Sequence, residues 1–205
     1  SLDRLLRPKT IAVYGGGWSG NVIKELKKIS FAGEIWAVHP TKKFLGGVKC
    51  YRSSFDLPSS PDAAFVGVNR EKTISIIKEL AELAAGGVVS FASGFSETSV
   101  DDKSEHGKTL QDKIKKVAGQ MPVLGPNCYG FINYLDDALI WPDQHGGLRV
   151  TSGVAIVSQS SNIAINITMQ TRGLPIAYMV TAGNQSQISQ AEIASQLLDD
   201  ERVSS

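Results

Sequence analysis

A glycine-rich turn near the amino terminus constrains the fold of this chain more than any other feature. The apolar segment 11–14 runs directly into Gly15-Gly16-Gly17-Trp18-Ser19-Gly20, which has the G-x-G-x-x-G spacing and precedes a stretch of helical periodicity. Glycines let the chain turn tightly off a buried strand, and they let a ligand approach main-chain N–H groups at the positive end of the helix. The pattern predicts a strand–turn–helix unit that binds the phosphates of a nucleotide.

The end of the next apolar segment narrows the kind of nucleotide. In a nicotinamide-binding unit the second strand ends in Asp or Glu, about twenty residues after the glycine loop, and this acid holds a ribose 2′-hydroxyl. Here the segment 35–38 ends instead in His39-Pro40-Thr41-Lys42-Lys43. This basic strand end favours a phosphate-rich ligand and argues against an NAD(P)-dependent oxidoreductase.

Composition excludes several other classes of protein. The 205 residues are 42% hydrophobic, which is enough apolar material for one large domain or two smaller ones. A net charge of +1 leaves no long basic stripe for nucleic acid, and no apolar run approaches bilayer length. The first residues lack the apolar core of a secretory signal, and Cys50 and Cys128 are too few for a disulfide framework. We expect a cytoplasmic protein with reduced thiols, no membrane or nucleic-acid partner, and no metal site.

Short apolar segments alternate with longer, helically patterned ones, which is typical of parallel strands joined by crossover helices. The candidate strands are 11–14, 35–38, 63–68, 88–92 and 122–124. We therefore predict an α/β fold with a doubly wound parallel sheet. The carboxyl ends of such strands lie along one edge of the sheet, where ligands bind. That edge is predicted to carry Gly15, His39-Pro40, Asn69-Arg70, Ser93-Gly94-Phe95 and Gly125-Pro126-Asn127.

The periodic pattern breaks after residue 131, and a second strand–turn–helix unit begins at residue 153. Its candidate strand 153–157 leads into Ser158-Gln159-Ser160-Ser161 and a helix-like segment, 163–169. The hydroxyl groups either cap the helix or help to bind an anion at its amino end. A strand over 177–180 and a helix over 190–198 follow. We predict a first domain over 1–133, a linker over 134–150 and the start of an incomplete second domain over 151–205.

The ordered set of motifs resembles a known family. It comprises the glycine loop, Val38-His39-Pro40 with its lysines, Ser93-Gly94-Phe95-Ser96-Glu97, Gly125-Pro126-Asn127-Cys128-Tyr129-Gly130, Val157-Ser158-Gln159-Ser160 and Gly183-Asn184. In this order the motifs make nearly the whole chain look like the amino-terminal portion of the nucleoside-diphosphate-forming acyl-CoA synthetases. These are relatives of the succinyl-CoA synthetase alpha subunit and of ADP-forming acetyl-CoA synthetase.

This resemblance implies a Rossmann-like CoA-binding domain followed by part of a flavodoxin-like ligase domain. Members of the family join a carboxylic acid and CoA at the expense of ATP or GTP with Mg, through an acyl phosphate and a phosphohistidine. The nucleotide binds mainly to ATP-grasp domains in the same or another chain, outside the segment seen here. A homo-oligomer is also compatible with the family.

The resemblance further implies roles for individual residues. The glycine loop, with Trp18 and Ser19, would hold CoA phosphates that Lys42 or Lys43 neutralise. Ser93-Gly94-Phe95 would face the pantetheine arm, and Asn127 and Cys128 would lie near the CoA thiol. The full set of implied CoA-binding residues is Gly15, Gly16, Gly17, Trp18, Ser19, Gly20, His39, Pro40, Lys42, Lys43, Asn69, Ser93, Gly94, Phe95, Asn127 and Cys128. The implied phosphate-binding residues are Ser158, Gln159, Ser160 and Ser161.

Several of these residues also have a simpler interpretation. The lysines could be solvated, Trp18 and Phe95 could be packing residues, and Cys128 could be a buried structural thiol. The chain has three histidines, His39, His106 and His145, and none stands where the family carries its phosphorylated histidine. His145, beside two glycines, is expected to be an exposed loop residue.

This chain also departs from the family at three places, where it has His39 in place of Asn, Ser161 in place of Gly, and no acid after Gly183-Asn184. We predict the CoA-binding portion of an acid–CoA ligase that contains no catalytic residue of its own and is inactive alone. The alternative is a non-catalytic CoA-binding or CoA-sensing module.

Overall fold

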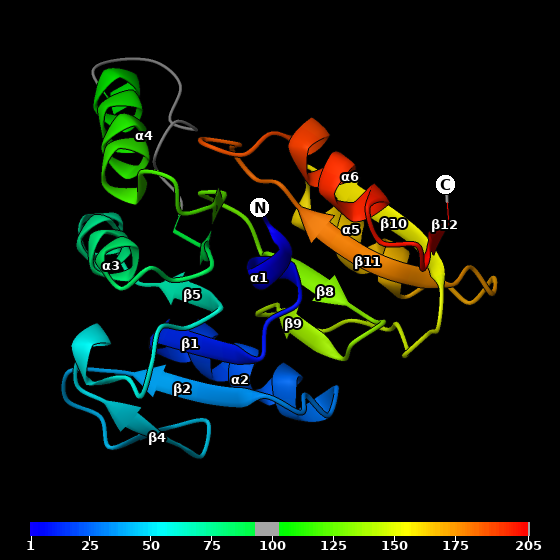
Figure 1. Ribbon diagram of the computed structural model, residues 1–205, viewed down its shortest axis with the longest axis horizontal. Helices are drawn as coiled ribbons and strands as arrows, with labels where there is room; N and C mark the ends of the chain where they lie inside the picture. The colour runs from blue at the N-terminus through cyan, green and yellow to red at the C-terminus, as the bar shows by residue number, and fades with distance from the viewer. Residues whose placement is uncertain (93–102, 205) are drawn as a thin grey trace.

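The computed structural model describes residues 1–92 and 103–204 and contains two sheets (Figure 1). The first sheet has the strand order β3-β4-β2-β1-β5-β6-β7 and is parallel except for the β3–β4 pair. Its strands are β1 (Thr10–Gly15), β2 (Glu34–Val38), β3 (Phe44–Leu45), β4 (Val48–Tyr51), β5 (Ala63–Gly67), β6 (Val88–Ser90) and β7 (Val123–Leu124). Its helices are α1 (Asp3–Leu6), α2 (Gly17–Lys28), the 3₁₀ turn Ser54–Asp56, α3 (Arg70–Glu82) and α4 (Lys103–Ala118).

Alternate residues of the central strand β1 point into two different cores. Ile11 and Val13 belong to a cluster that includes Val22 and Leu26 of α2, while Tyr14 belongs to a second cluster on the α3 side. Side chains alternate across a strand, so β1 is covered on both faces and its sequence is a continuous apolar run. The doubly wound parallel sheet predicted from the sequence is thereby confirmed.

The second sheet has the strand order β12-β10-β11-β8-β9. Its strands are β8 (Phe131–Asn133), β9 (Ala138–Ile140), β10 (Gly153–Ser158), β11 (Ile176–Thr181) and β12 (Val203–Ser204), and its helices are α5 (Ser161–Thr168) and α6 (Gln190–Leu198). β10 pairs in parallel with β11 and β12, whereas β8 runs antiparallel to both β11 and β9. This unit contains the strand–turn–helix that the sequence predicts after residue 153.

The segment 134–150, expected as a linker, contributes to the second sheet. Phe131 pairs with Val180 of β11 and with Ile140 of β9, and Trp141 is completely buried. His145 is also buried, with 6% of its surface exposed, so the expectation of an exposed loop histidine was wrong. The hairpin could not be predicted from the sequence, because each strand has only three residues and so is too short to show the alternation of apolar and polar residues that is typical of a strand.

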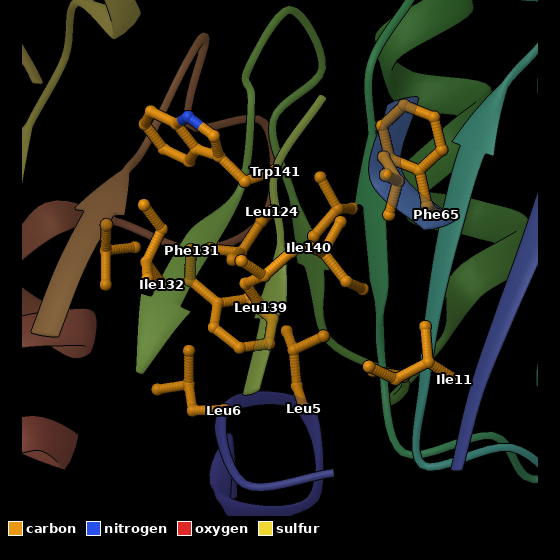
Figure 2. Packing of buried hydrophobic residues seen from close by; sticks show 14 of the residues in the cluster. Leu5, Leu6, Ile11, Phe65, Leu124, Phe131, Ile132, Leu139, Ile140 and Trp141 are labelled. Atoms are coloured by element: carbon orange, nitrogen blue, oxygen red, sulfur yellow. The ribbon is translucent and has the colours of Figure 1, made fainter. Parts of the chain in front are cut away.

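A continuous apolar core connects the two sheets. Figure 2 shows Leu5 and Leu6 of α1 beside Leu139 and Phe131 of the β8–β9 hairpin, with Ile11 farther along the same cluster. Helix α2 also packs against β9. The first and second units are therefore held together by buried side chains and not by a flexible connection. Within the described residues, no helix is long and apolar enough to cross a membrane.

Candidate functional site

Two adjoining cavities open at the carboxyl edge of the first sheet. The larger, cavity A, has a volume of about 750 Å³, and cavity B has a volume of about 550 Å³. Both are bounded by Gly67, Val68 and Asn69 at the end of β5, so they meet there. Cavity A is otherwise lined by Tyr14, Gly15, Gly16, Val38, His39, Pro40, Thr41, Arg52, Ser53, Ser54, Lys72, Ser75, Ile76 and Glu79. Cavity B is otherwise lined by Trp18, Arg70, Glu71, Phe91, Ala92, Asn127, Cys128, Tyr129 and Ser161.

The glycine loop forms one wall of cavity A. Gly15 has a φ of +124°, and a Cβ there would lie 2.4 Å from the carbonyl oxygen of Gly67, so only glycine fits between β1 and β5. Gly16 and Gly17 have open space where a side chain would project. A ligand can therefore approach the backbone at the amino end of α2, as the sequence predicts for a phosphate cradle.

The remaining residues of the loop have different environments. Trp18, on the first turn of α2, is 47% exposed and lines cavity B, where its ring centroid lies 5.3 Å from that of Phe91. Ser19 is fully buried, and its hydroxyl donates to the carbonyl of Tyr14 at 2.7 Å. Gly20 faces Leu45. Gly17, Ser19 and Gly20 line neither cavity, and Ser19 holds the loop in shape instead of reaching a ligand.

His39 and Pro40 line cavity A at the end of β2. The Nδ1 atom of His39 accepts hydrogen bonds from the backbone N–H groups of Thr41 and Lys42, at 3.2 and 3.0 Å. Its proton is therefore assigned to Nε2. Burial, followed by the charges of Lys42, Arg52 and Lys72, lowers the pKa of His39 below its ordinary value. His39 is thus a neutral hydrogen-bond donor near pH 7 and contributes no positive charge to the cavity.

The positive charge in cavity A comes from residues that the sequence analysis missed. Lys42 and Lys43 do not line it, and Lys43 borders a second groove of about 460 Å³, which shares Arg52 with cavity A. Arg52 and Lys72 line cavity A instead. Arg52 follows the β3–β4 hairpin, and only a prediction of that hairpin could have brought it back beside the end of β2.

A hydrogen-bonded chain of three side chains lines another part of cavity A. The Tyr14 hydroxyl donates to Ser54 Oγ at 3.1 Å, and the Ser54 hydroxyl donates to Glu79 Oε2 at 2.6 Å. Burial raises the pKa of Tyr14, so its hydroxyl stays protonated and remains a donor. Cavity A thus contains two cations, Arg52 and Lys72, and one carboxylate, Glu79, which accepts hydrogen bonds.

Cavity B is walled by aromatic side chains and ends near a buried thiol. The ring of Phe91 lies 5.8 Å from that of Tyr129, which together with Trp18 gives three aromatic rings along the cavity. Burial raises the pKa of the Cys128 thiol to about 12. A protonated, desolvated thiol is a poor nucleophile, which agrees with a lining role for Cys128.

The Asn127 region is held in place by the second sheet. Asn184 and Ser186 donate their backbone N–H groups to the carbonyls of Pro126 and Gly125, at 2.9 and 3.0 Å. Thr181 Oγ1 accepts from the N–H groups of Tyr129 and Gly130. The loop after β11 thus fixes the loop after β7, and both sheets are needed to position cavity B.

Of the four predicted phosphate-binding residues, one lies at the cavities. Ser161, the first residue of α5, lines cavity B. Ser160 is the N-cap of α5 and accepts from the N–H of Ile163, and Ser158 exchanges hydrogen bonds with the backbone of Ser160. Gln159 is exposed.

Two other predicted CoA-binding residues, Asn69 and Asn127, border the cavities. The predicted residues Ser93, Gly94 and Phe95 lie outside the described part of the chain.

Two family models match the chain. One, described as a CoA binding domain, covers residues 9–134, and the other, described as a succinyl-CoA ligase like flavodoxin domain, covers residues 151–205.

Individual relatives agree with these models. The chain is 31% identical to a trans-feruloyl-CoA synthase from an unknown prokaryotic organism, over 98% of this chain and 29% of that protein. It is 27% identical to an ADP-forming acetate–CoA ligase from Methanocaldococcus jannaschii, over 95% of this chain and 27% of that protein. The chain therefore spans less than a third of the length of these two relatives.

Solved structures share the fold. The crystal structure of PH0766 from Pyrococcus horikoshii OT3 superposes with a TM-score of 0.86 and 27% identity, over 99% of this chain and 47% of that one. The apo form of an acetyl-coenzyme A synthetase 1 from Ca. Korarchaeum cryptofilum superposes with a TM-score of 0.84 at 24% identity, over 99% of this chain and 44% of that one. Both resemblances extend across the two sheets.

Proposed function

Because the chain belongs to the CoA-binding domain family, we propose that it is the CoA-binding portion of an acid–CoA ligase that forms a nucleoside diphosphate. The observation that carries this proposal is the pair of cavities that meet at the end of β5 beside the glycine loop. Cavity A, with Arg52 and Lys72, suits the phosphorylated adenosine of CoA. In this proposal cavity B, with its aromatic wall, holds the less polar pantetheine arm, and the thiol lies toward Ser161.

The two units divide the chemistry between them in this proposal. The first unit, ending near residue 133, binds CoA, and the second, from residue 151, belongs to the ligase part. In the complete enzyme the CoA sulfur attacks the carbonyl carbon of an acyl phosphate. A C–S bond forms, the C–O bond to phosphate breaks, and the thiol proton leaves with the phosphate. The N–H groups at the start of α5 would stabilise the departing phosphate.

The nucleotide chemistry belongs to parts of the enzyme outside this chain. We place it on ATP-grasp domains in the same or another chain, in a cytoplasmic enzyme that uses ATP. No histidine occurs between residues 153 and 205, so this segment has no imidazole to accept a phosphoryl group. A non-catalytic CoA-binding module remains the second candidate, and the departures from the family at Ser161 and at Gln185, where no acid follows Gly183-Asn184, are the observations that favour it.

Calorimetric titration of the chain with CoA and with NAD⁺ tests the proposal. We expect saturable CoA binding that is tighter than NAD⁺ binding. Gly17 starts α2 with open space around it, so Gly17→Glu should keep the fold and repel the CoA phosphates. Its uncharged match, Gly17→Gln, is the control, and we expect CoA to bind Gly17→Glu at least about tenfold more weakly than Gly17→Gln. Tighter NAD⁺ binding, or equal CoA affinity in the two variants, would contradict the proposal.

The aromatic wall of cavity B also favours a class of acid substrate. We propose an aromatic acid, because Trp18, Phe91 and Tyr129 offer ring faces beside Ser161, and because one relative is named a trans-feruloyl-CoA synthase. In saturation-transfer NMR of the chain without CoA, in which the pantetheine arm does not occupy cavity B, 4-hydroxycinnamate should receive magnetisation while butyrate receives little.

The aromatic contact can be removed without disturbing cavity A. Trp18→Ala should abolish the cinnamate signal, whereas Phe44→Ala, which removes an exposed ring outside cavity B, should leave it unchanged. Equal signals from cinnamate and butyrate, or a signal that survives in Trp18→Ala, would exclude an aromatic substrate in this cavity.

A further inference from the structure

Arg52 and Lys72 are two cations that face the same cavity from distant parts of the sequence. Arg52 follows β4, and Lys72 lies on the first turn of α3. Across residues 1–92 and 103–204, neither side chain forms an ion pair with a carboxylate. The charges of Lys42, Arg52 and Lys72 all lower the pKa of His39, and of these three cations Arg52 and Lys72 line the cavity. Two unpaired cations beside one ring repel each other, and a bound anion would relieve that repulsion.

The guanidinium of Arg52 is anchored at the wall of cavity A and keeps donors for such an anion. Its Nη1 atom donates to the carbonyl of Pro40 at 2.8 Å, which leaves the Nε and Nη2 edge free for a fork of two hydrogen bonds. Two parallel donors match two oxygens of a phosphate group. The amino end of α3 adds a partial positive charge, and the side chain of Asn69 caps that end by accepting from the Lys72 N–H at 2.9 Å.

This anion subsite is separate from the glycine loop. The loop follows β1 and offers backbone donors at Gly16 and the start of α2, whereas Arg52 and Lys72 come from the ends of other elements around the same cavity. A ligand of cavity A therefore has two phosphate positions. Glu79 is the carboxylate that lines cavity A, and it already accepts a hydrogen bond from Ser54. A second hydrogen bond to Glu79 is available to an amino or hydroxyl group of a ligand that lies between the two phosphate positions.

We propose that Arg52 and Lys72 bind the 3′-phosphate of the CoA adenosine, while the glycine loop receives the 5′-diphosphate. The consequence is selectivity: this chain discriminates CoA from 3′-dephospho-CoA. The inference rests on the proposed function, since it names the part of the same ligand that cavity A recognises. Lys42 and Lys43 lie off the cavity lining, so we assign the direct contacts to Arg52 and Lys72, although the charge of Lys42 also acts on His39.

The test compares matched ligands on the purified chain by calorimetry at constant ionic strength. The first pair is CoA and 3′-dephospho-CoA, and the second is adenosine 3′,5′-bisphosphate and AMP. In each pair the 3′-phosphorylated ligand should bind at least about tenfold more tightly, as expected for one charge-assisted phosphate contact. Arg52→Gln and Lys72→Gln should each remove most of this preference and leave the affinity for 3′-dephospho-CoA unchanged.

Two further substitutions control for loss of charge alone. Lys49→Gln removes a cation from the same hairpin as Arg52, and Lys78→Gln removes one from the same helix as Lys72, yet neither residue lines cavity A. Both control variants should keep the preference for CoA.

The outcomes separate this inference from the proposed function. Equal affinities for CoA and 3′-dephospho-CoA would overturn the 3′-phosphate subsite while leaving CoA binding in place. The same holds if Arg52→Gln and Lys72→Gln weaken both ligands alike, or if the control variants lose the preference too. Absence of any CoA binding by the folded wild-type chain would overturn the proposed function and this inference together.

Discussion

At the scale of single residues, burial decides what the two cysteines can do. Cys128 is buried where it lines cavity B, and burial raises its thiol pKa to about 12. Burial is also the main cause that raises the pKa of Cys50. A higher pKa means less thiolate at neutral pH, and the thiolate is the species that alkylates. We expect iodoacetamide at pH 7.5 to leave the native chain unmodified over a period in which the urea-unfolded chain takes up two labels, measured by mass spectrometry. Rapid labelling of Cys128 in the native chain would show that its thiol is accessible and reactive.

At the scale of elements, the contact between the loops after β7 and β11 depends on Gly183. Its φ is +57°, and a Cβ there would lie 2.4 Å from the Pro126 carbonyl and 2.7 Å from Cys128 Cβ. Gly119 is a matched control, because its φ is +56° and nothing lies within 4 Å of the added atom.

Gly119→Ala should cost about 1 kcal/mol of unfolding free energy for the left-handed backbone alone. Gly183→Ala should cost about 2–4 kcal/mol and weaken CoA binding as well, because backbone atoms must separate. Urea unfolding and calorimetry measure both effects, and equal costs for the two variants would show that the loops do not need this close approach.

At the scale of the whole molecule, one arginine joins segments that lie far apart in the sequence. Arg202 donates to Asp200 and to Asp136 of the β8–β9 turn, and it keeps the pKa of each carboxyl below the ordinary 3.8. A lowered carboxyl pKa stabilises the fold above the unfolded pKa, and that stability is lost as the pH falls through about 4 and below. Arg202→Gln should therefore destabilise the chain by about 1–3 kcal/mol at pH 7, allowing for the partial exposure of Arg202, and should flatten the loss of stability between pH 5 and 3.

Arg149, which pairs with Asp137 in the same turn but is 69% exposed, provides the control for this prediction. Arg149→Gln should change the unfolding free energy by no more than about 0.5 kcal/mol at each pH measured. Urea unfolding at pH 7, 5 and 3.5 measures these differences. An unchanged pH profile in Arg202→Gln would show that this ion-pair network does not govern acid stability.

The amino-acid sequence by itself determined the features that depend on neighbours along the chain. The glycine loop after β1, the basic end of β2 and the serine-rich start of α5 are local patterns whose geometry follows from a strand, a turn and a helix in succession. The alternation of apolar segments and helical stripes was long enough to predict the doubly wound sheet. The order of the motifs was sufficient to indicate the family.

Only the tertiary structure decided which of these residues face a ligand. Ser19 belongs to the glycine motif, yet its hydroxyl turns inward to Tyr14, while Arg52 and Lys72 belong to no motif and line cavity A. The burial of His145 was equally hidden, because the hairpin that leads to it has three-residue strands and gains its stability from β11. Such placements arise from contacts between residues far apart in the sequence, and no local period or spacing encodes them.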